Sequence, residues 1–348
     1  MLGIGNTWHG DAAVGPLAMH ALRVRQILGV TVVATNVVDH ECLMSQTRVL
    51  AEPWFLEPQN EERGYMNTAE WKWTSQDGLE LYANAWTPDG QARGLVCLVH
   101  GLGEHIGRYQ ADAAALTQAG YILAGFDQRG FGQSAGRKGH TPSLDAYFDD
   151  IGHFLDAMTQ RYPGLPTFLY GHSMGGILVL AYTPLRHPPV VGVIATSPGL
   201  KSSIEAQQAK VLLVKLLGSA WPTLTLQSEI DAQMLSRDPR VAEEYVNDPL
   251  VHTTVTAGWG KAMLQAVPLA YQQAPSFPVP LLLMHGADDQ IAYPEGSRRY
   301  AALAPKDKLT FKEWAGYKHE LHTDSEKAVI FAAMVMWLDE HCAAAPAA

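Results

Sequence analysis

The chain has 348 residues, a formal net charge of −10 at pH 7 and a pI near 5.7. With 47% hydrophobic and 17% charged residues, its composition is that of a globular protein, which excludes disordered and fibrous classes. The acidic balance and the lack of a lysine or arginine cluster argue against a nucleic-acid partner, and no uncharged apolar run is long enough for a membrane-spanning helix.

Residues 1–66 form an N-terminal extension whose structure the sequence does not predict. Residues 27–34 follow two arginines and weakly resemble a signal peptide, but no small-residue cleavage pattern stands close behind them. The alternatives are a surface segment or a true start at Met44. The three cysteines are too scattered for a disulfide framework: Cys42, Cys97 and Cys342. We therefore expect a cytoplasmic protein, with peripheral membrane contact or export as alternatives.

Ordered structure is expected from residue 67, where two antiparallel strands open the domain. Residues 71–73 and 79–86 alternate in period two around a turn that contains Asp77-Gly78. Short continuous apolar runs follow, typical of strands buried on both faces of a parallel sheet: 94–99, 121–126, 166–170, 190–196 and 278–284. Helical patterns such as residues 144–162 separate them. The alternation predicts an α/β fold, a mostly parallel sheet with helices on both faces.

The alternation stops over residues 199–275, which is too long for a plain connection. We expect an inserted helical cap there, dividing a core made of residues 67–198 and 276–348. Within the insertion, residues 211–217 are apolar nearly all round. This stretch is either a helix buried against the sheet domain, or an acyl-binding wall or rim that touches lipid surfaces.

Residues 171–175 have the form G-x-S-x-G between an apolar strand and an apolar helix. On such an elbow the serine has a strained backbone, and the two glycines leave room where strand and helix would otherwise collide. The hydroxyl of Ser173 is then exposed at a helix N-terminus, where N–H groups favour a developing negative charge. Ser173 is therefore our candidate nucleophile.

A serine nucleophile needs a base that an acid holds in place. Asp288 and Asp289 follow the strand that ends near His285, at the sheet edge where open α/β sheets carry their sites. We favour Asp289 because Gly-x-x-Asp is the usual spacing after such a strand, and Asp288 is the alternative. His319 is our base, with His322 the weaker candidate. The chain order serine, aspartate, histidine is the one this sheet topology requires.

The loop at residues 100–105, His-Gly-Leu-Gly-Glu-His, supplies the third requirement, an oxyanion hole. We expect its donors to be the backbone N–H groups of Leu102 and Met174. The loop lacks the glycine pattern and the Lys-Ser/Thr ending of a nucleotide-binding loop. A zinc site at His319 and His322 is disfavoured. Metalloprotease histidines stand four positions apart on a helix, whereas these two stand three positions apart in a loop. We expect no metal and no cofactor.

Several motifs together resemble the monoacylglycerol lipase and lysophospholipase branch of the α/β-hydrolase superfamily. They are the elbow, the H-G-x-G-E-H-x-x-R-Y stretch at residues 100–109, and residues 127–134 and 248–252. The resemblance covers about residues 67–342, and the first sixty or so residues depart from it. It implies the same triad and the same oxyanion donors. It also implies that three residues contact the glycerol head group: Glu104, Arg108 and His322. An equally good interpretation of these three is structural hydrogen bonding around the loop.

The sequence thus predicts a serine hydrolase that cleaves lipid carboxylic esters through an acyl-enzyme. The resemblance points to monoacylglycerol as the substrate, giving glycerol and a fatty acid. The alternatives are a broader carboxylesterase, a lysophospholipase or an acyltransferase. From another class, a non-catalytic binding protein on the same fold is the outside alternative. The expected partner is a small lipid ester, with transient contact of the cap with lipid surfaces.

Overall fold

The computed structural model describes residues 66–203, 208–228 and 230–343. The extension expected over residues 1–66 lies outside the described residues apart from Met66, and so do the stretch that resembles a signal peptide and Met44. The chain divides into two units, residues 1–62 and 63–348. The architecture below is that of the second unit.

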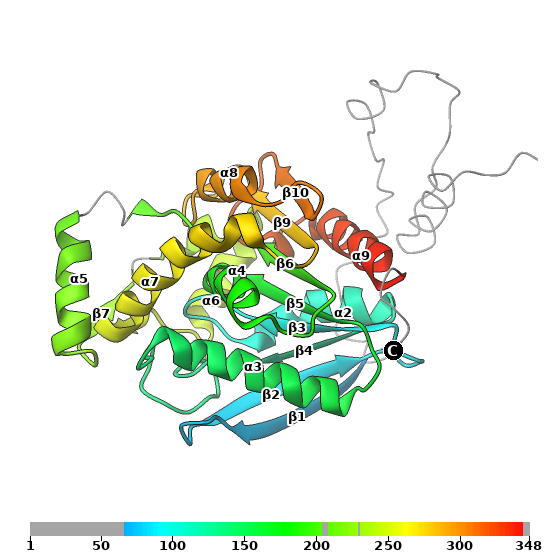
Figure 1. Ribbon diagram of the computed structural model, residues 1–348, viewed down its shortest axis with the longest axis horizontal. Helices are drawn as coiled ribbons and strands as arrows, with labels where there is room; N and C mark the ends of the chain where they lie inside the picture. The colour runs from blue at the N-terminus through cyan, green and yellow to red at the C-terminus, as the bar shows by residue number, and fades with distance from the viewer. Residues whose placement is uncertain (1–65, 204–207, 229, 344–348) are drawn as a thin grey trace, which may run out of the picture. The chain divides into compact units, whose positions relative to one another are not determined.

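Eight strands form one sheet in the order β1-β2-β4-β3-β5-β6-β9-β10 (Figure 1). The pairs β1–β2 and β2–β4 are antiparallel, and the remaining pairs are parallel. The strand bounds are β1 Asn67–Thr74, β2 Glu80–Thr87, β3 Gly94–Val99, β4 Tyr121–Phe126, β5 Thr167–His172, β6 Gly192–Thr196, β9 Leu281–Gly286 and β10 Leu309–Trp314. The predicted sheet, with antiparallel strands at its N-terminal side, is confirmed.

The strand ends differ from the sequence expectation by a few residues. β9 begins at Leu281 rather than at residue 278, because Pro278 and Pro280 have no N–H group to donate to a ladder. β5 runs on to His172, so the first glycine of the elbow is still part of the strand and pairs with Val99 of β3. Ser173, the candidate nucleophile, therefore follows a central strand directly.

Helices cover both faces of the sheet. α2 packs with α9 and α3 packs with α4, while α8 lies against β9 (Figure 1). Their bounds are α2 Gln110–Gln118, α3 Leu144–Arg161, α4 Met174–Arg186, α8 Pro294–Leu303 and α9 Lys327–Ala343, with the short turns η1 Ile106–Tyr109 and η5 Leu321–Thr323. α3 starts at a Ser143 cap, and its buried apolar side chains recur at helical spacing as predicted.

The insertion between β6 and β9 is mostly helical, as expected of the cap. It contains α5 Gln208–Ala220, β7 Thr225–Gln227, η3 Ala232–Met234, α6 Pro239–Asn247, β8 Thr254–Thr256, α7 Ala257–Gln273 and η4 Ala274–Ser276. α7 packs on both α4 and α5, and β7 pairs with β8 in a small antiparallel sheet. Across the described residues, no helix combines the length and the apolar character needed to cross a bilayer.

The apolar stretch at residues 211–217 lies on α5, and the interpretation of it as a buried helix is wrong. Leu212, Leu213 and Leu216 are 59%, 54% and 61% exposed, and Trp221 just beyond the helix is 59% exposed. Only part of α5 is covered, because α7 is its main packing partner and contacts one side of it. The other side presents large apolar side chains to solvent.

Candidate active site

Ser173 stands between β5 and α4 with a left-handed backbone, at φ 52° and ψ −112°. A non-glycine residue rarely adopts this conformation, and it is typical of a nucleophile elbow. The turn is tight because β3, β5 and α4 converge there: a Cβ on Gly175 would overlap the carbonyl oxygen of Val99. The sequence folds this way because residue 175 carries no side chain.

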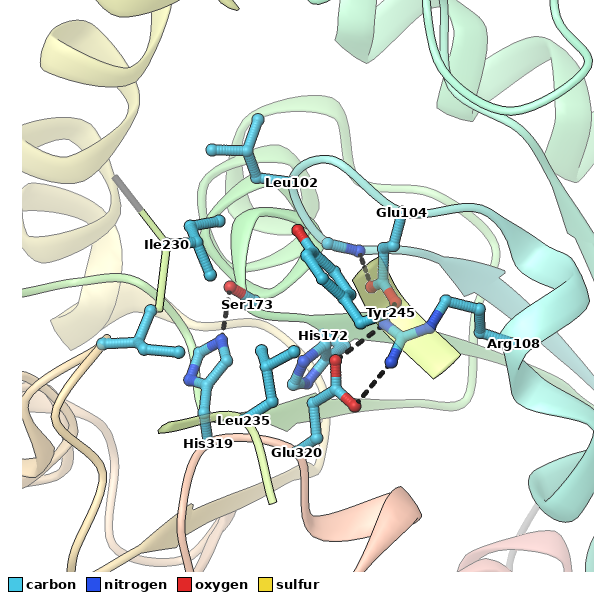
Figure 2. Close-up of a pocket in the computed structure, with 12 residues that line it drawn as sticks. Leu102, Glu104, Arg108, His172, Ser173, Ile230, Leu235, Tyr245, His319 and Glu320 are labelled. Carbon is cyan, nitrogen blue, oxygen red and sulfur yellow. Dashed lines mark hydrogen bonds and ion pairs between the residues drawn. The ribbon is translucent and has the colours of Figure 1, made fainter. Parts of the chain in front are cut away.

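A chain of hydrogen bonds joins Ser173 to the two residues expected beside it. Ser173 Oγ lies 2.9 Å from His319 Nε2 (Figure 2). His319 Nδ1 in turn lies 2.7 Å from Asp289 Oδ2. Asp289 and His319 are both 3% exposed, whereas Asp288 is exposed. The structure thus brings together the favoured aspartate and the favoured histidine with the serine.

The carboxylate of Asp289 is held by four donors. Oδ1 accepts the backbone N–H groups of Ile291 at 2.8 Å and Ala292 at 3.0 Å, and Oδ2 is contacted by His319 and, at 3.1 Å, by His285 Nε2. Burial acts to raise the pKa of Asp289, but the two histidines outweigh it and hold the pKa well below its usual range. Asp289 is therefore ionised and fixed in orientation.

The imidazole of His319 has the contacts and the pKa direction expected of the candidate base. Its burial, the largest single influence, acts to lower the pKa, while the carboxylates of Asp289, Glu320 and Glu104 act to raise it, and the net pKa of His319 is raised. Since the N–H group at Nδ1 donates its hydrogen bond to Asp289, Nε2 carries no proton and can accept that of the Ser173 hydroxyl.

Two backbone N–H groups beside Ser173 are available to an incoming oxyanion. Met174 is the first residue of α4, and Leu102 lies in the loop after β3. Neither N–H group donates a hydrogen bond to any described residue. An anion at this point would also meet the positive end of the α4 dipole.

A cavity of about 20 Å³ opens beside Ser173, and residues from several loops line it (Figure 2). The core contributes Leu102 and Ile291, and the insertion contributes Ile230, Leu235 and Tyr245. This volume holds about one water molecule. A larger ligand therefore requires that side chains of the insertion move aside.

Glu104 and Arg108, two of the expected head-group residues, both line this cavity and are bonded to each other. Arg108 Nη1 lies 2.9 Å from Glu104 Oε2 and 2.7 Å from Glu320 Oε1, and Arg108 Nη2 lies 2.9 Å from Glu320 Oε2. Glu104 Oε1 accepts the Tyr109 hydroxyl at 2.7 Å and the backbone N–H of Gly101. Protein partners therefore already satisfy both side chains.

His322, the third expected head-group residue, does not line the cavity. It lies in η5, which turns its ring onto Tyr109, stacked at a centroid distance of 4.6 Å, and against the edge of the His172 ring. It is 1% exposed, and burial lowers the pKa of His322 to about 4. His322 is thus a neutral buried ring behind the triad.

Hydrogen bonds connect the insertion to the loop that carries His319. The Glu320 N–H donates to the Leu235 carbonyl at 2.7 Å, and Lys318 Nζ donates to the Gln233 carbonyl at 2.7 Å. Arg237 contacts Asp324 through two hydrogen bonds of 2.8 and 2.6 Å. The part of the insertion that lines the cavity is thereby fixed to the base loop.

Sequence reasoning missed several residues of this site. His285 could have been found, because it stands at the end of β9 four residues before Asp289. Glu320 and the cavity-lining residues of the insertion gave no signal. Among them, Tyr245 is 4% exposed, its hydroxyl has no partner in the described part of the chain, and Figure 2 shows it directed towards the Ser173 side of the cavity.

Within the described ranges, no group of three or more histidine, cysteine, aspartate or glutamate side chains is arranged to hold a metal ion. The partly buried serine and the buried histidine and aspartate, at the carboxyl edge of a mostly parallel sheet, instead have the arrangement of a serine hydrolase on the α/β-hydrolase fold.

Comparison with known proteins identifies the family. The family model described as Serine aminopeptidase, S33 (Hydrolase_4) matches residues 90–326, and the chain belongs to this family of the α/β-hydrolase superfamily. An abhydrolase domain-containing protein from Dictyostelium discoideum is 37% identical over 76% of this chain, which spans 28% of that relative's length. Human monoglyceride lipase is 32% identical over 77% of this chain and 90% of its own.

Solved structures agree with this assignment. The crystal structure of the monoacylglycerol lipase of Paleococcus ferrophilus is 34% identical to this chain, with a TM-score of 0.68. The match covers 79% of this chain and all of that one. The likeness therefore extends through the sheet and the insertion rather than resting on the elbow alone.

Proposed function

We propose that the protein hydrolyses monoacylglycerol to glycerol and a fatty acid through an acyl-enzyme. The observation that carries the chemistry is the hydrogen-bonded chain from Ser173 through His319 to Asp289. The substrate is supported by the relatives, since the human and Paleococcus ferrophilus proteins are named monoglyceride or monoacylglycerol lipases.

In the proposed reaction, Ser173 Oγ attacks the ester carbonyl as its proton passes to His319 Nε2. The carbonyl oxygen becomes an oxyanion that accepts hydrogen bonds from the N–H groups of Leu102 and Met174. His319 then gives its proton to the departing glycerol oxygen, which leaves the acyl group on Ser173. A water molecule that gives a proton to His319 then attacks this ester, and His319 returns the proton to Ser173 Oγ as the fatty acid leaves.

Two roles remain for Glu104 and Arg108: direct contact with the glycerol hydroxyls, or support of the loop around Leu102. Their positions on the cavity favour the first role, and their hydrogen bonds to protein partners favour the second. For His322 we favour support of the site, because it is buried against Tyr109 and does not line the cavity.

Hydrolysis of a matched substrate panel tests this proposal. Purified protein is given monoacyl-, diacyl- and triacylglycerol and a lysophospholipid of the same acyl chain, and kcat/KM is compared. Preference for monoacylglycerol is the expected result. A preference for lysophospholipid or triacylglycerol overturns the substrate, and transfer of the acyl group to an added alcohol rather than to water identifies an acyltransferase. A protein that no fluorophosphonate labels is a non-catalytic member of the fold.

We also propose that α5 rests on lipid surfaces and brings the site to its substrate. The helix exposes Leu212, Leu213 and Leu216 on the insertion that lines the cavity. Apolar side chains of this size gain free energy when they leave water for the acyl region of a bilayer. The proposal concerns surface contact and not a membrane-spanning segment.

Replacing Leu212, Leu213 and Leu216 together by serine is expected to weaken binding to phosphatidylcholine vesicles by at least about 100-fold, because about 1 kcal/mol or more is lost per leucine and the three losses add to about 3 kcal/mol. Vesicle co-sedimentation measures this binding. Hydrolysis of a soluble aryl ester should stay unchanged. The control is a variant with Leu185→Ser and Leu303→Ser, which removes exposed leucines from α4 and α8. Equal binding by both variants contradicts the proposal.

A further inference from the structure

Glu320 follows His319 in the chain, and its side chain points away from the base into a buried ion pair. Its carboxylate is 2% exposed and receives both terminal nitrogens of Arg108, at 2.7 and 2.9 Å (Figure 2). Two parallel bonds between a planar guanidinium and a carboxylate fix their mutual geometry as well as their separation. The residue beside the base is therefore held by a rigid link.

The same arginine reaches the loop that carries the oxyanion donor. Arg108 Nη1 also bonds Glu104 Oε2 at 2.9 Å, and Glu104 Oε1 accepts the N–H of Gly101, the residue before Leu102. The guanidinium in addition stacks over the Tyr245 ring of α6, at 5.0 Å from its centroid. A continuous series of contacts thus runs from the loop after β3 to the loop after β10.

We propose that Arg108 and Glu320 are positioning residues that hold the His319 loop in register with the oxyanion loop. This inference rests on the proposed function, since it assigns no new chemistry to the site. Base and oxyanion donors act on the same tetrahedral carbon, so a shift of one loop against the other misplaces both. A displacement of about 1 Å in such a site can reduce the rate by about 100-fold.

The pair also sets the charge around the base. Glu320 is ionised in this arrangement: burial acts to raise its pKa, but the charge and hydrogen bonds of Arg108 hold the pKa below its usual range. Its negative charge contributes to the raised pKa of His319. The titratable and charged groups that face His319 from the surrounding elements are Asp289, His172, Glu104, Arg108, Glu320 and His322.

Glu320→Gln tests the proposal, because the amide keeps the shape of the side chain and loses the charged bidentate contact. We expect the rate of fluorophosphonate labelling and kcat for 4-nitrophenyl acetate to fall about 10- to 100-fold, with little change in KM. This ester has no glycerol, so a lower labelling rate or kcat reflects the position of the reacting groups and not head-group binding. The midpoint of the acid limb of kcat/KM against pH should move to lower pH, because His319 loses a neighbouring negative charge.

Glu313→Gln is the matched control. Glu313 makes a bidentate pair with Arg298, with two bonds of 2.7 Å, on the exposed side of β10 and away from the cavity. The substitution is the same and removes the same kind of contact. Labelling rate, kcat and pH profile should all equal those of the unmodified protein.

Arg108→Lys provides a second test that does not depend on the first variant folding. The ammonium keeps the positive charge but cannot make the two parallel bonds to Glu320. We expect a similar loss in labelling rate and kcat. The double variant Arg108→Lys with Glu320→Gln should lose no more than the worse single variant, because both changes break the same link. Thermal unfolding establishes that each variant is folded at the assay temperature.

Two results overturn the inference while leaving the proposed function intact. In the first, the folded variants are labelled at the same rate as the unmodified protein, and the acid limb of kcat/KM against pH does not move. The other is a loss confined to monoacylglycerol and expressed in KM, which makes the pair a head-group site. Failure of the unmodified protein itself to react with fluorophosphonate is a different outcome, and it removes the proposed function.

Discussion

Replacing Ser173 with alanine is expected to lower kcat for a soluble aryl ester by about 10⁶-fold and to abolish covalent labelling by a fluorophosphonate. The nucleophile is lost while the N–H groups of Leu102 and Met174 remain, so slow hydrolysis above the uncatalysed rate should persist. Alanine at this position keeps the backbone of the elbow, at φ 52°, with the same side-chain clash as serine. Mass spectrometry of the labelled protein and steady-state kinetics provide the measurements.

Ser197→Ala is the control for Ser173→Ala. Ser197 also has a positive φ, 43°, and is fully buried at the end of β6, and its hydroxyl has no hydrogen-bond partner among the described residues. Labelling and turnover should survive its replacement. Persistent labelling of the Ser173 variant at the original rate would show that another residue is the nucleophile.

Replacing Asp289 with asparagine is expected to lower kcat by about 10⁴-fold. The N–H groups of Ile291 and Ala292 donate to Oδ1, and they will hold the carbonyl oxygen of the asparagine in that place. Its amide nitrogen then faces His319 Nδ1 as a donor. His319 is thereby forced to carry its proton on Nε2, where it can no longer accept the proton of Ser173.

Asp288→Asn is the control for Asp289→Asn. It removes the same charge one residue earlier, from a side chain that is exposed and does not contact His319. Its kcat should match that of the unmodified protein. If Asp288→Asn caused the larger loss, the assignment of Asp289 as the acid would be wrong. Rates of fluorophosphonate labelling, measured beside kcat, separate a defect in attack from a defect in deacylation.

The sheet could be predicted from the sequence because its signals are local. Each inner strand is a short apolar run with glycine or proline close to its ends, and a strand of this kind is buried whichever neighbours it has. The elbow, the aspartate after β9 and the histidine after β10 could be located for the same reason, since each follows a strand end at the same edge of the sheet.

The contents of the cavity could not be predicted, because they depend on contacts across long stretches of chain. Arg108 and Glu320 are 212 positions apart, and nothing beside either residue indicates the other. Leu235 and Tyr245 reach the cavity only because of how the whole insertion folds. The exposure of α5 could not be predicted from the sequence either, because the sequence of an apolar helix does not show whether its outer side contacts protein or solvent.

The hydrogen bonds between the insertion and the base loop suggest how the cap could be re-engineered. Gln233, Leu235 and Arg237 are bonded to the segment that carries His319, so a change of length there would displace the base. Residues 208–228 lie outside these contacts and include the exposed side of α5. A chimera that exchanges this segment and retains residues 230–273 can alter access to the site while the geometry of its reacting groups is inherited unchanged.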